Sequence, residues 1–393
     1  MVSSSNRNRS FILSLVNVGR AFINPFFIAL VSYLFIKLEN KDGLFQINRL
    51  IVYANAVLVF AGWGLKDYLT RVYSTNSKDF PKKWSMALYS KCFLLLISFL
   101  LLGFLFKDND LLILTGFIFI RTLNQHFEVL MQFDKRNMGI MAIELTLILF
   151  ILLAISFGKI QGSFNFFIGL IISEAIKLAI NIIVFRMPLP QFKWKEIYDL
   201  LNETKFFFLA SIVGFFQSKA DLYILAGSVK QHDLNEYQVI TSLISLAYIT
   251  IFAFTAYYSK LLFRSIYNSN RTFLYLNMIT GLITAITFSA GIYVVLQFVY
   301  NFALSKTEFI LVITNIFIFS IMLVEMYHYN KLNRVGQSTL IIFIAGVINL
   351  MVGSVLIGKY SVLGAIISNT GSLLILTITL FLVRISDKKI AQK

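Results

Sequence analysis

Long apolar runs alternate along the chain with short polar connections. Twelve runs reach the ~20 residues that a helix needs to cross a bilayer. Because the apolar residues are continuous within each run, we expect helices there. The pattern predicts an all-α integral membrane protein with about 12 transmembrane helices. The predicted spans are 11–36, 44–65, 84–106, 111–133, 138–157, 164–185, 206–225, 237–262, 272–300, 309–329, 338–357 and 360–383.

The amino-acid composition removes the main alternatives. Apolar residues (AVILMFWYC) make up 58% of the chain and charged residues 14%, and the mean hydropathy is +0.77. A soluble globular domain is nearer ~45–50% apolar and ~25% charged. These values exclude a soluble enzyme, a disordered chain and a fibrous protein.

The basic residues divide unevenly between the two sides that twelve alternating spans define. Of the 35 Lys and Arg residues, 22 fall on one side, 7 on the other and 6 within spans. Cytoplasmic loops are enriched in Lys and Arg, so both termini are predicted to be cytoplasmic. The same enrichment accounts for the net charge of +16 without nucleic acid as a partner.

Few residues carry the chemistry of an enzyme or a metal site. A single cysteine, Cys92, forms no intramolecular disulfide, and His126, His232 and His328 lack the spacing of metal ligands. No Walker motif or G-x-S-x-G motif occurs. The expected protein is therefore not an enzyme and has no cofactor, apart from a possible H⁺ or Na⁺ coupling ion.

Short motifs recur at a nearly constant offset, which indicates an internal repeat. The repeat predicts an N-terminal six-helix bundle (1–186), a cytoplasmic amphipathic linker (187–205) and a C-terminal six-helix bundle (206–393). With an even number of helices in each half, the bundles are expected to share orientation about a pseudo-two-fold axis along the membrane normal. The paired motifs are Gly43–Gln46 with Asn235–Gln238, Leu69–Tyr73 with Leu262–Tyr267, Gly158–Lys159 with Gly358–Lys359, and Ile171–Glu174 with Ile366–Asn369.

Polar residues inside the first span are the sharpest chemical signal. Arg20 and Asn24 are four residues apart and share a helix face, and Pro25 beside them predicts a kink or hinge. A charge in the bilayer core is costly, so such residues usually face a cavity or one another. Because the first span offers Arg20 no acidic partner within a turn, we expect its guanidinium to be exposed in a central, positively biased chamber.

Further charged residues lie within other spans, and each has a plain alternative to a role in a site. Lys91, Arg49 and Glu144 are close enough to span ends to extend toward the interface. Glu174 and Lys177 are spaced for an ion pair within one helix, and Arg121 and Glu128 for a bridge to a neighbouring helix. If these groups instead line one chamber, it suits an anionic headgroup, since guanidinium binds phosphate bidentately. The expected substrate-binding residues are Arg20, Asn24, Arg49, Arg121, Lys177 and Lys219, and the expected ion-coupling residues are Glu128, Glu174 and Asp221.

Several of these segments together resemble Wzx-type polysaccharide flippases of the multidrug/oligosaccharidyl-lipid/polysaccharide exporter superfamily. The resemblance rests on Gln217–Gly227 with Asn235–Gln238, on Asn24-Pro25 through Gly43–Phe45 to Gly62–Arg71, and on Leu363–Ser368. It covers the whole chain. It implies ion-coupled flipping, by alternating access, of an undecaprenyl-pyrophosphate-linked oligosaccharide for O-antigen or another surface polysaccharide. The implied location is the bacterial cytoplasmic (inner) membrane.

The resemblance also implies partners and leaves alternatives. The partners would be the lipid-linked oligosaccharide, membrane lipids, and a polysaccharide polymerase with its chain-length regulator. Related flippases hold the pyrophosphate with basic residues on the first two helices. Arg20 and Arg49 lie on the corresponding helices of this chain. The alternatives are a cation-coupled multidrug or small-molecule antiporter of the same superfamily and a membrane glycan-modifying enzyme.

Overall fold

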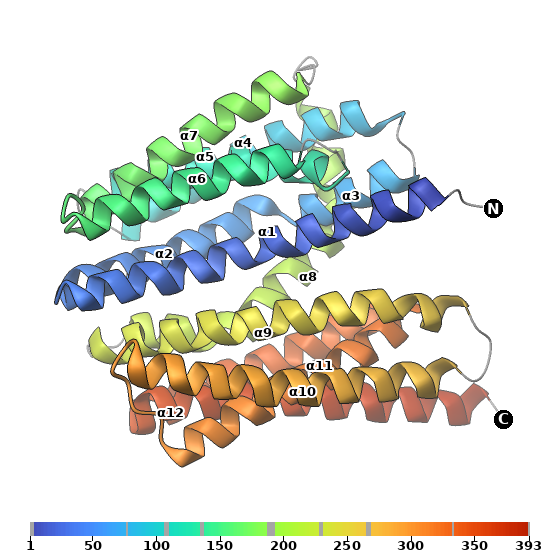
Figure 1. Cartoon of the computed structure of the whole chain (residues 1–393). Helices are drawn as coiled ribbons and strands as arrows, with labels where there is room; N and C mark the ends of the chain where they lie inside the picture. Colours follow the sequence, from blue (N-terminus) through green and yellow to red (C-terminus); the bar gives the residue numbers. More distant parts are fainter. Residues whose placement is uncertain are drawn as a thin grey trace. The chain divides into compact units, whose positions relative to one another are not determined.

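The computed structural model describes residues 4–75, 78–105, 110–133, 137–186, 193–227, 231–264, 269–331 and 334–391. All regular secondary structure in these ranges is α-helical, as the apolar pattern predicts (Figure 1). The helices are α1 (Ser4–Lys37), α2 (Lys41–Gly62), α3 (Leu65–Thr75), α4 (Phe80–Leu105), α5 (Asp110–Phe133), α6 (Asn137–Ser156), α7 (Ser163–Phe185), α8 (Trp194–Ala226), α9 (Gln231–Arg264), α10 (Ser269–Phe298), α11 (Lys306–Lys331) and α12 (Val335–Ala391).

Ten of these helices are long and apolar enough to cross a membrane. They supply eleven of the twelve predicted spans, because α12 contains two of them. The span predicted at 111–133 corresponds to α5, a 24-residue helix whose polar residues keep it outside that group. The chain is therefore an all-helical multi-pass membrane protein.

The long helix α12 is a hairpin of two antiparallel halves. Its helical geometry is interrupted at Ser361, where φ is 52° and ψ is −124°. The Ser368 hydroxyl donates to Asn349 Oδ1 (2.6 Å), and the Ser372 hydroxyl donates to the carbonyl of Ala345 (3.4 Å). The residue number increases from 368 to 372 in one half while that of its partner decreases from 349 to 345 in the other. This is the pattern of antiparallel helices. The break lies one residue after the predicted boundary between 357 and 360, and it confirms that two spans occur here.

The described chain forms two compact units. Unit 1 comprises residues 1–20 and 37–212, and unit 2 comprises 21–36 and 213–393. The division falls within α1 after Arg20 and within α8 after Ile212. Each unit is described separately below.

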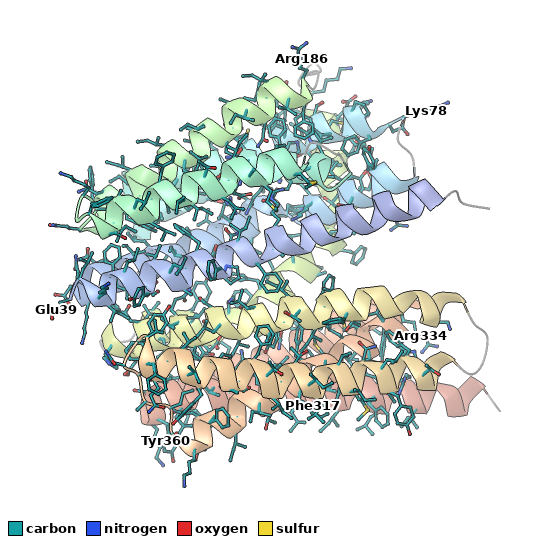
Figure 2. All side chains as sticks on the ribbon, in the orientation of Figure 1. Glu39, Lys78, Arg186, Phe317, Arg334 and Tyr360 are labelled. Carbon is teal, nitrogen blue, oxygen red and sulfur yellow. The ribbon has the colours of Figure 1, made fainter. Side chains whose placement is uncertain are left out.

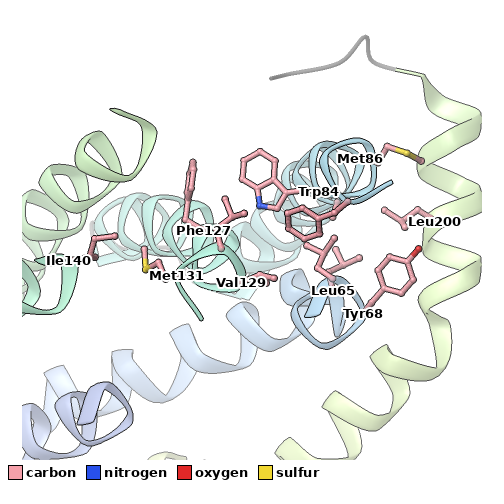
Figure 3. Packing of buried hydrophobic residues seen from close by; sticks show 13 residues of the cluster. Leu65, Tyr68, Trp84, Met86, Phe127, Val129, Met131, Ile140 and Leu200 are labelled. Carbon is pink, nitrogen blue, oxygen red and sulfur yellow. The ribbon is translucent and has the colours of Figure 1, made fainter. Parts of the chain in front are cut away.

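Unit 1 is built around α5, which packs against α2, α4 and α7. A buried apolar cluster joins α3, α4, α5 and the first turns of α8, and Figure 3 shows its aromatic centre around Trp84 and Phe127. The short helix α3 lies in the segment 66–83, where no helix was predicted. It was missed because only long apolar runs were sought, whereas α3 carries charged residues on one side and cluster residues such as Leu65 and Leu69 on the other.

A sharp bend at Trp63 and Gly64, called the α2–α3 elbow below, connects α2 to α3. It contacts the N-terminal part of α8, which includes the end of the predicted cytoplasmic linker. The Trp63 indole donates to the carbonyl of Leu201 (3.3 Å), and its ring stacks on Phe208 with centroids 3.6 Å apart. Gly64 has a φ of +62°, and a Cβ there would lie 2.5 Å from the backbone of Phe207. Glycine is therefore required both by its conformation and by the close approach of α8.

The start of α8 is also held by polar contacts from α3 and α4. The Tyr68 hydroxyl donates to Glu203 (2.9 Å), and Lys83 pairs with the same carboxylate (2.6 Å). Burial raises the pKa of the Tyr68 phenol, so the hydroxyl keeps its proton and remains a donor.

The predicted linker, residues 187–205, overlaps the start of α8. Residues 187–192, including Pro188 and Pro190, lie outside the described residues. From Trp194 onward the segment is the start of the 33-residue helix α8. The helix continues because no proline or glycine interrupts the sequence between Trp194 and Phe206. Trp194 and Tyr198 remain exposed, as expected for interfacial aromatic residues.

Unit 2 is arranged around α11, which packs against α9, α10 and α12. Large apolar side chains such as Ile283, Phe298 and Val355 are exposed on its helices. In Figure 2 side chains project outward along the helices of both units. Exposed apolar surface of this extent is suited to lipid and not to water.

Candidate functional site

The centre of unit 1 contains a buried carboxylate held by two cations. Glu144 on α6 accepts from Arg20 Nε on α1 at 3.1 Å and from Lys177 Nζ on α7 at 2.5 Å. The three side chains are 10%, 13% and 3% exposed, respectively. Low exposure strengthens these contacts relative to a surface pair, because little water screens them.

The expectation that the Arg20 guanidinium is exposed in a chamber is wrong in this structure, because Glu144 of another helix pairs with it. Glu144 lies 124 residues away, and only the packing of α6 beside α1 supplies it. The hydrogen-bonding capacity of the guanidinium is nevertheless not fully used by the described residues. Its Nη1 lies against the weak acceptor Met131 Sδ (2.8 Å), and its buried Nη2 has no hydrogen-bond partner among the described residues.

A second carboxylate, Glu174 on α7, is more completely bonded. It accepts from Arg121 Nη1 (2.6 Å) and from the Asn124 amide (2.6 Å), both on α5. Asn181 in turn donates to Asn124 (3.0 Å). The predicted pair of Glu174 with Lys177 within α7 is present at 3.9 Å and is secondary to these shorter contacts.

Glu128 and Lys91 form the part of the cluster nearest to α3. Glu128 pairs with Lys66 of α3 at 2.8 Å and not with Arg121, so it bridges to a helix that was not predicted. Lys91 is only 2% exposed, which contradicts the alternative that it extends to the interface. No carboxylate of the described residues lies within ion-pair distance of its ammonium group. The cluster therefore contains five basic groups and three acidic groups: Arg20, Lys66, Lys91, Arg121 and Lys177 against Glu128, Glu144 and Glu174.

Two predicted substrate residues of the first two helices are not in this cluster. The Arg49 guanidinium lies over the Phe45 ring, 5.8 Å from its centroid, and its buried Nε has no hydrogen-bond partner in the described chain. Asn24 is exposed on α1, and Pro25 lies within the same helix. Asn17, which extends the polar stripe in sequence, lies outside the residues whose side chains are described.

Unit 2 contains a different kind of polar site, in which Asp221 of α8 is 1% exposed. Its Oδ2 accepts from the Tyr237 hydroxyl of α9 and from the Asn369 amide of α12 (3.3 Å). Its buried Oδ1 has no partner among the described residues. The predicted neighbour Lys219 is half-buried and forms no ion pair with a described residue.

The network around Asp221 extends through neutral side chains. Asn315 of α11 donates to Asn369 Oδ1 (3.0 Å) and lies 3.1 Å from the Thr370 hydroxyl. The Tyr248 hydroxyl donates to Asn315. These residues were not predicted as site residues, because every predicted substrate-binding or ion-coupling residue within the spans except Asn24 is charged. The sequence signal that could have identified them is the presence of uncharged amide side chains, such as Asn315 and Asn369, within apolar runs.

The two units contain related contacts at repeat-equivalent positions. In unit 1 Asn124 donates to Glu174, and in unit 2 Asn315 donates to Asn369. Asn315 lies 191 residues after Asn124, and Asn369 lies 195 residues after Glu174, close to the offsets of the sequence repeat. One copy has a carboxylate where the other has an amide. The corresponding contacts therefore differ in charge.

Within the described residues, no group of three or more His, Cys, Asp or Glu residues could hold a metal ion. His126 is fully buried, and its Nε2 lies 2.9 Å from the carbonyl of Trp84. The Trp84 indole donates to the carbonyl of His126 (3.3 Å). This reciprocal contact joins α4 to α5 and is structural.

The comparisons identify the fold. No family model and no curated protein sequence matches the chain. The structure of the lipid II flippase MurJ in an inward-closed conformation is similar, with a TM-score of 0.69 and 13% identity over 95% of this chain and 87% of MurJ. So is an inward-facing multidrug-resistance MATE-family transporter of the MOP superfamily, with a TM-score of 0.62 and 11% identity over 96% and 99% of the two chains. A eukaryotic MATE transporter has a TM-score of 0.57 and 12% identity over 96% of each chain.

These similarities define the class of fold. The chain has the fold shared by a lipid flippase and by MATE transporters of the MOP superfamily. At 11–13% identity the likeness concerns the fold and not the substrate.

Proposed function

We propose that this protein is a flippase that moves an undecaprenyl-pyrophosphate-linked oligosaccharide across the cytoplasmic membrane by ion-coupled alternating access. The observation that carries the proposal is the surplus of basic over acidic groups in unit 1, where the buried Arg20 Nη2 has no hydrogen-bond partner among the described residues. A guanidinium binds phosphate through two parallel hydrogen bonds. A pyrophosphate headgroup is therefore the ligand that this cluster suits, and the likeness to MurJ supports a lipid-linked substrate.

The ion-coupling part of the proposal assigns roles to the buried carboxylates. Asp221 is the main candidate, because its Oδ1 is buried and uncommitted while Tyr237 and Asn369 hold its other oxygen. Protonation or binding of Na⁺ would compensate this charge. Glu128 and Glu174 are weaker candidates, since cations already neutralise both carboxylates.

The test uses the basic residues of the first two helices. In a host strain deleted for this gene, Arg20→Ala and Arg49→Ala are each expected to abolish or strongly reduce surface polysaccharide. Arg20 belongs to the basic cluster, whereas Arg49 is included because the resemblance to polysaccharide flippases implies a pyrophosphate contact from the second helix. Lys78→Ala, which alters an exposed residue between α3 and α4, serves as the control and should restore the polysaccharide. If both arginine variants are expressed and restore polysaccharide fully, the cationic-site model is wrong.

The second candidate function is a cation-coupled multidrug antiporter, which the likeness to MATE transporters favours. A drug-resistance assay in a pump-deleted strain separates the two functions. Increased resistance together with no effect on polysaccharide would favour the antiporter. Reconstituted vesicles provide the direct measurement: a labelled lipid-linked oligosaccharide should cross the bilayer, and collapse of the H⁺ or Na⁺ gradient should slow its transfer.

A further inference from the structure

Glu144 differs from the other carboxylates of unit 1 in what holds it. Both of its oxygens are bound by cations from other helices, Arg20 Nε at 3.1 Å and Lys177 Nζ at 2.5 Å. No neutral donor among the described residues contacts its carboxylate. By contrast, Glu174 is also fixed by the Asn124 amide at 2.6 Å. Glu144 is thus held by charge alone, and another anion could satisfy the same two cations.

One of the two cations around Glu144, Arg20, has hydrogen-bonding capacity to spare. Among the described residues, the buried Arg20 Nη2 has no hydrogen-bond partner, and Nη1 contacts the weak acceptor Met131 Sδ. The cluster as a whole also has five basic groups and three acidic groups, so its negative charge does not balance its positive charge. Glu144 itself carries one negative charge. A phosphate group has more oxygens and more negative charge than a carboxylate, so it would bond the guanidinium edge that Glu144 leaves unused.

We propose that Glu144 is an internal counter-ion that occupies an anion subsite formed by Arg20 and Lys177, and that the phosphate of the lipid-linked substrate displaces it. This inference rests on the proposed function and adds a mechanism to the same site. Exchange of one anion for another avoids leaving Arg20 without an anionic partner, which would be costly. When the substrate leaves, Glu144 returns to the cations and opposes rebinding. The carboxylate thus lowers substrate affinity and favours release.

The test measures binding by the purified full-length protein, with inorganic pyrophosphate and a polyprenyl pyrophosphate as probes. Glu144→Gln removes the competing charge, so its affinity for both probes should rise at least tenfold over the native protein. Glu325→Gln is the matched control, because Arg384 Nε and Glu325 Oε2 form a buried pair of the same 3.1 Å length in unit 2. This control should leave affinity unchanged. The double variant Arg20→Gln/Glu144→Gln should lose the gain.

Stability is measured in parallel by thermal unfolding, since Glu144→Gln leaves Arg20 without its carboxylate partner and Lys177 with the more distant Glu174 (3.9 Å). If that variant does not fold, Glu144→Asp is used, because it keeps the charge but shortens the side chain and weakens the pair. It should give a smaller gain in affinity. A folded Glu144 variant with native or weaker affinity overturns the proposal. The proposal is also overturned if Glu325→Gln gains as much affinity as Glu144→Gln, or if the Arg20→Gln/Glu144→Gln double variant keeps the gain.

The outcomes also separate this inference from the proposed function. If Glu144→Gln gains affinity for both probes but the protein does not transport lipid-linked oligosaccharide, the counter-ion role of Glu144 is supported and the flippase function is rejected. A gain for inorganic pyrophosphate alone would overturn the lipid-linked source of the phosphate. Transport without any gain in the Glu144 variants would reject only the counter-ion role.

Discussion

The buried charged residues of unit 1 show how costly charges are accommodated within a membrane-spanning helical unit. Each acidic group there lies within ion-pair distance of at least one basic group, as with Glu144 beside Lys177 and Glu174 beside Arg121. Such pairs come from different helices, so they also fix how the helices pack. Removing one partner leaves a buried charge, which is more damaging than removing both.

This reasoning gives a prediction for the pair of Arg121 and Glu174. Arg121→Gln is expected to lower the free energy of unfolding by ~3–5 kcal/mol, because Glu174 is left with only Asn124 and the more distant Lys177. The double variant Arg121→Gln/Glu174→Gln should recover much of that loss. Thermal unfolding of the purified protein measures both. Strictly additive effects of the two substitutions would show that the pair contributes no coupling energy.

Among the elements, the α2–α3 elbow illustrates how a short segment positions a long helix. Trp63 and Gly64 bring α3 against α8, where the indole bonds to Leu201 and stacks on Phe208. The contact depends on a left-handed backbone at Gly64 and on the absence of a side chain there. The elbow thus couples the sequence after the second span to a helix more than 130 residues later.

Gly64→Ala is predicted to destabilise the protein by at least ~1–2 kcal/mol, because alanine disfavours the left-handed conformation and its Cβ would clash with the Phe207 backbone. The matched control is Gly62→Ala, where a Cβ would meet no atom within 4 Å. Gly62 ends α2, so alanine there should be neutral or stabilising by up to ~1 kcal/mol. Melting temperatures of both variants test this difference. Similar values for the two would argue against the close approach of α8.

For the whole molecule, the repeat predicted from the sequence motifs is accompanied by a similar spacing of helix starts. Helices α2 and α9 begin 190 residues apart, and α4 and α10 begin 189 residues apart. The charges did not follow the repeat: unit 1 holds its carboxylates in ion pairs, whereas Asp221 in unit 2 lies among neutral donors. The two halves therefore offer different chemistry within one architecture.

The orientation in the membrane is predicted from the distribution of Lys and Arg and can be tested by cysteine labelling. In a Cys92→Ser background, Lys159→Cys should react with a membrane-impermeant maleimide added to intact cells, because its loop is predicted to lie outside. Lys78→Cys should react only in inverted vesicles. Both residues are exposed, so access to the reagent depends on the side of the membrane. The reverse pattern would place the termini outside.

The sequence alone was sufficient to predict the helical class, eleven of the spans and the break in α12, because each depends on local apolar length and on short polar connections. The helix α3 was missed because a short amphipathic helix lacks that apolar length. The charge count of the loops predicts an orientation, although Lys135 and Arg136, which contribute to it, lie outside the described residues.

Only the tertiary structure decided which charged residues meet. Sequence spacing can pair residues three or four apart on one helix, as for Glu174 and Lys177, but it does not specify partners on separate helices. Arg20 and Glu144 are 124 residues apart, and the network of Asp221 draws on four helices through amides and hydroxyls. These contacts depend on the packing of helices side by side, which many residues determine jointly and which no local pattern records.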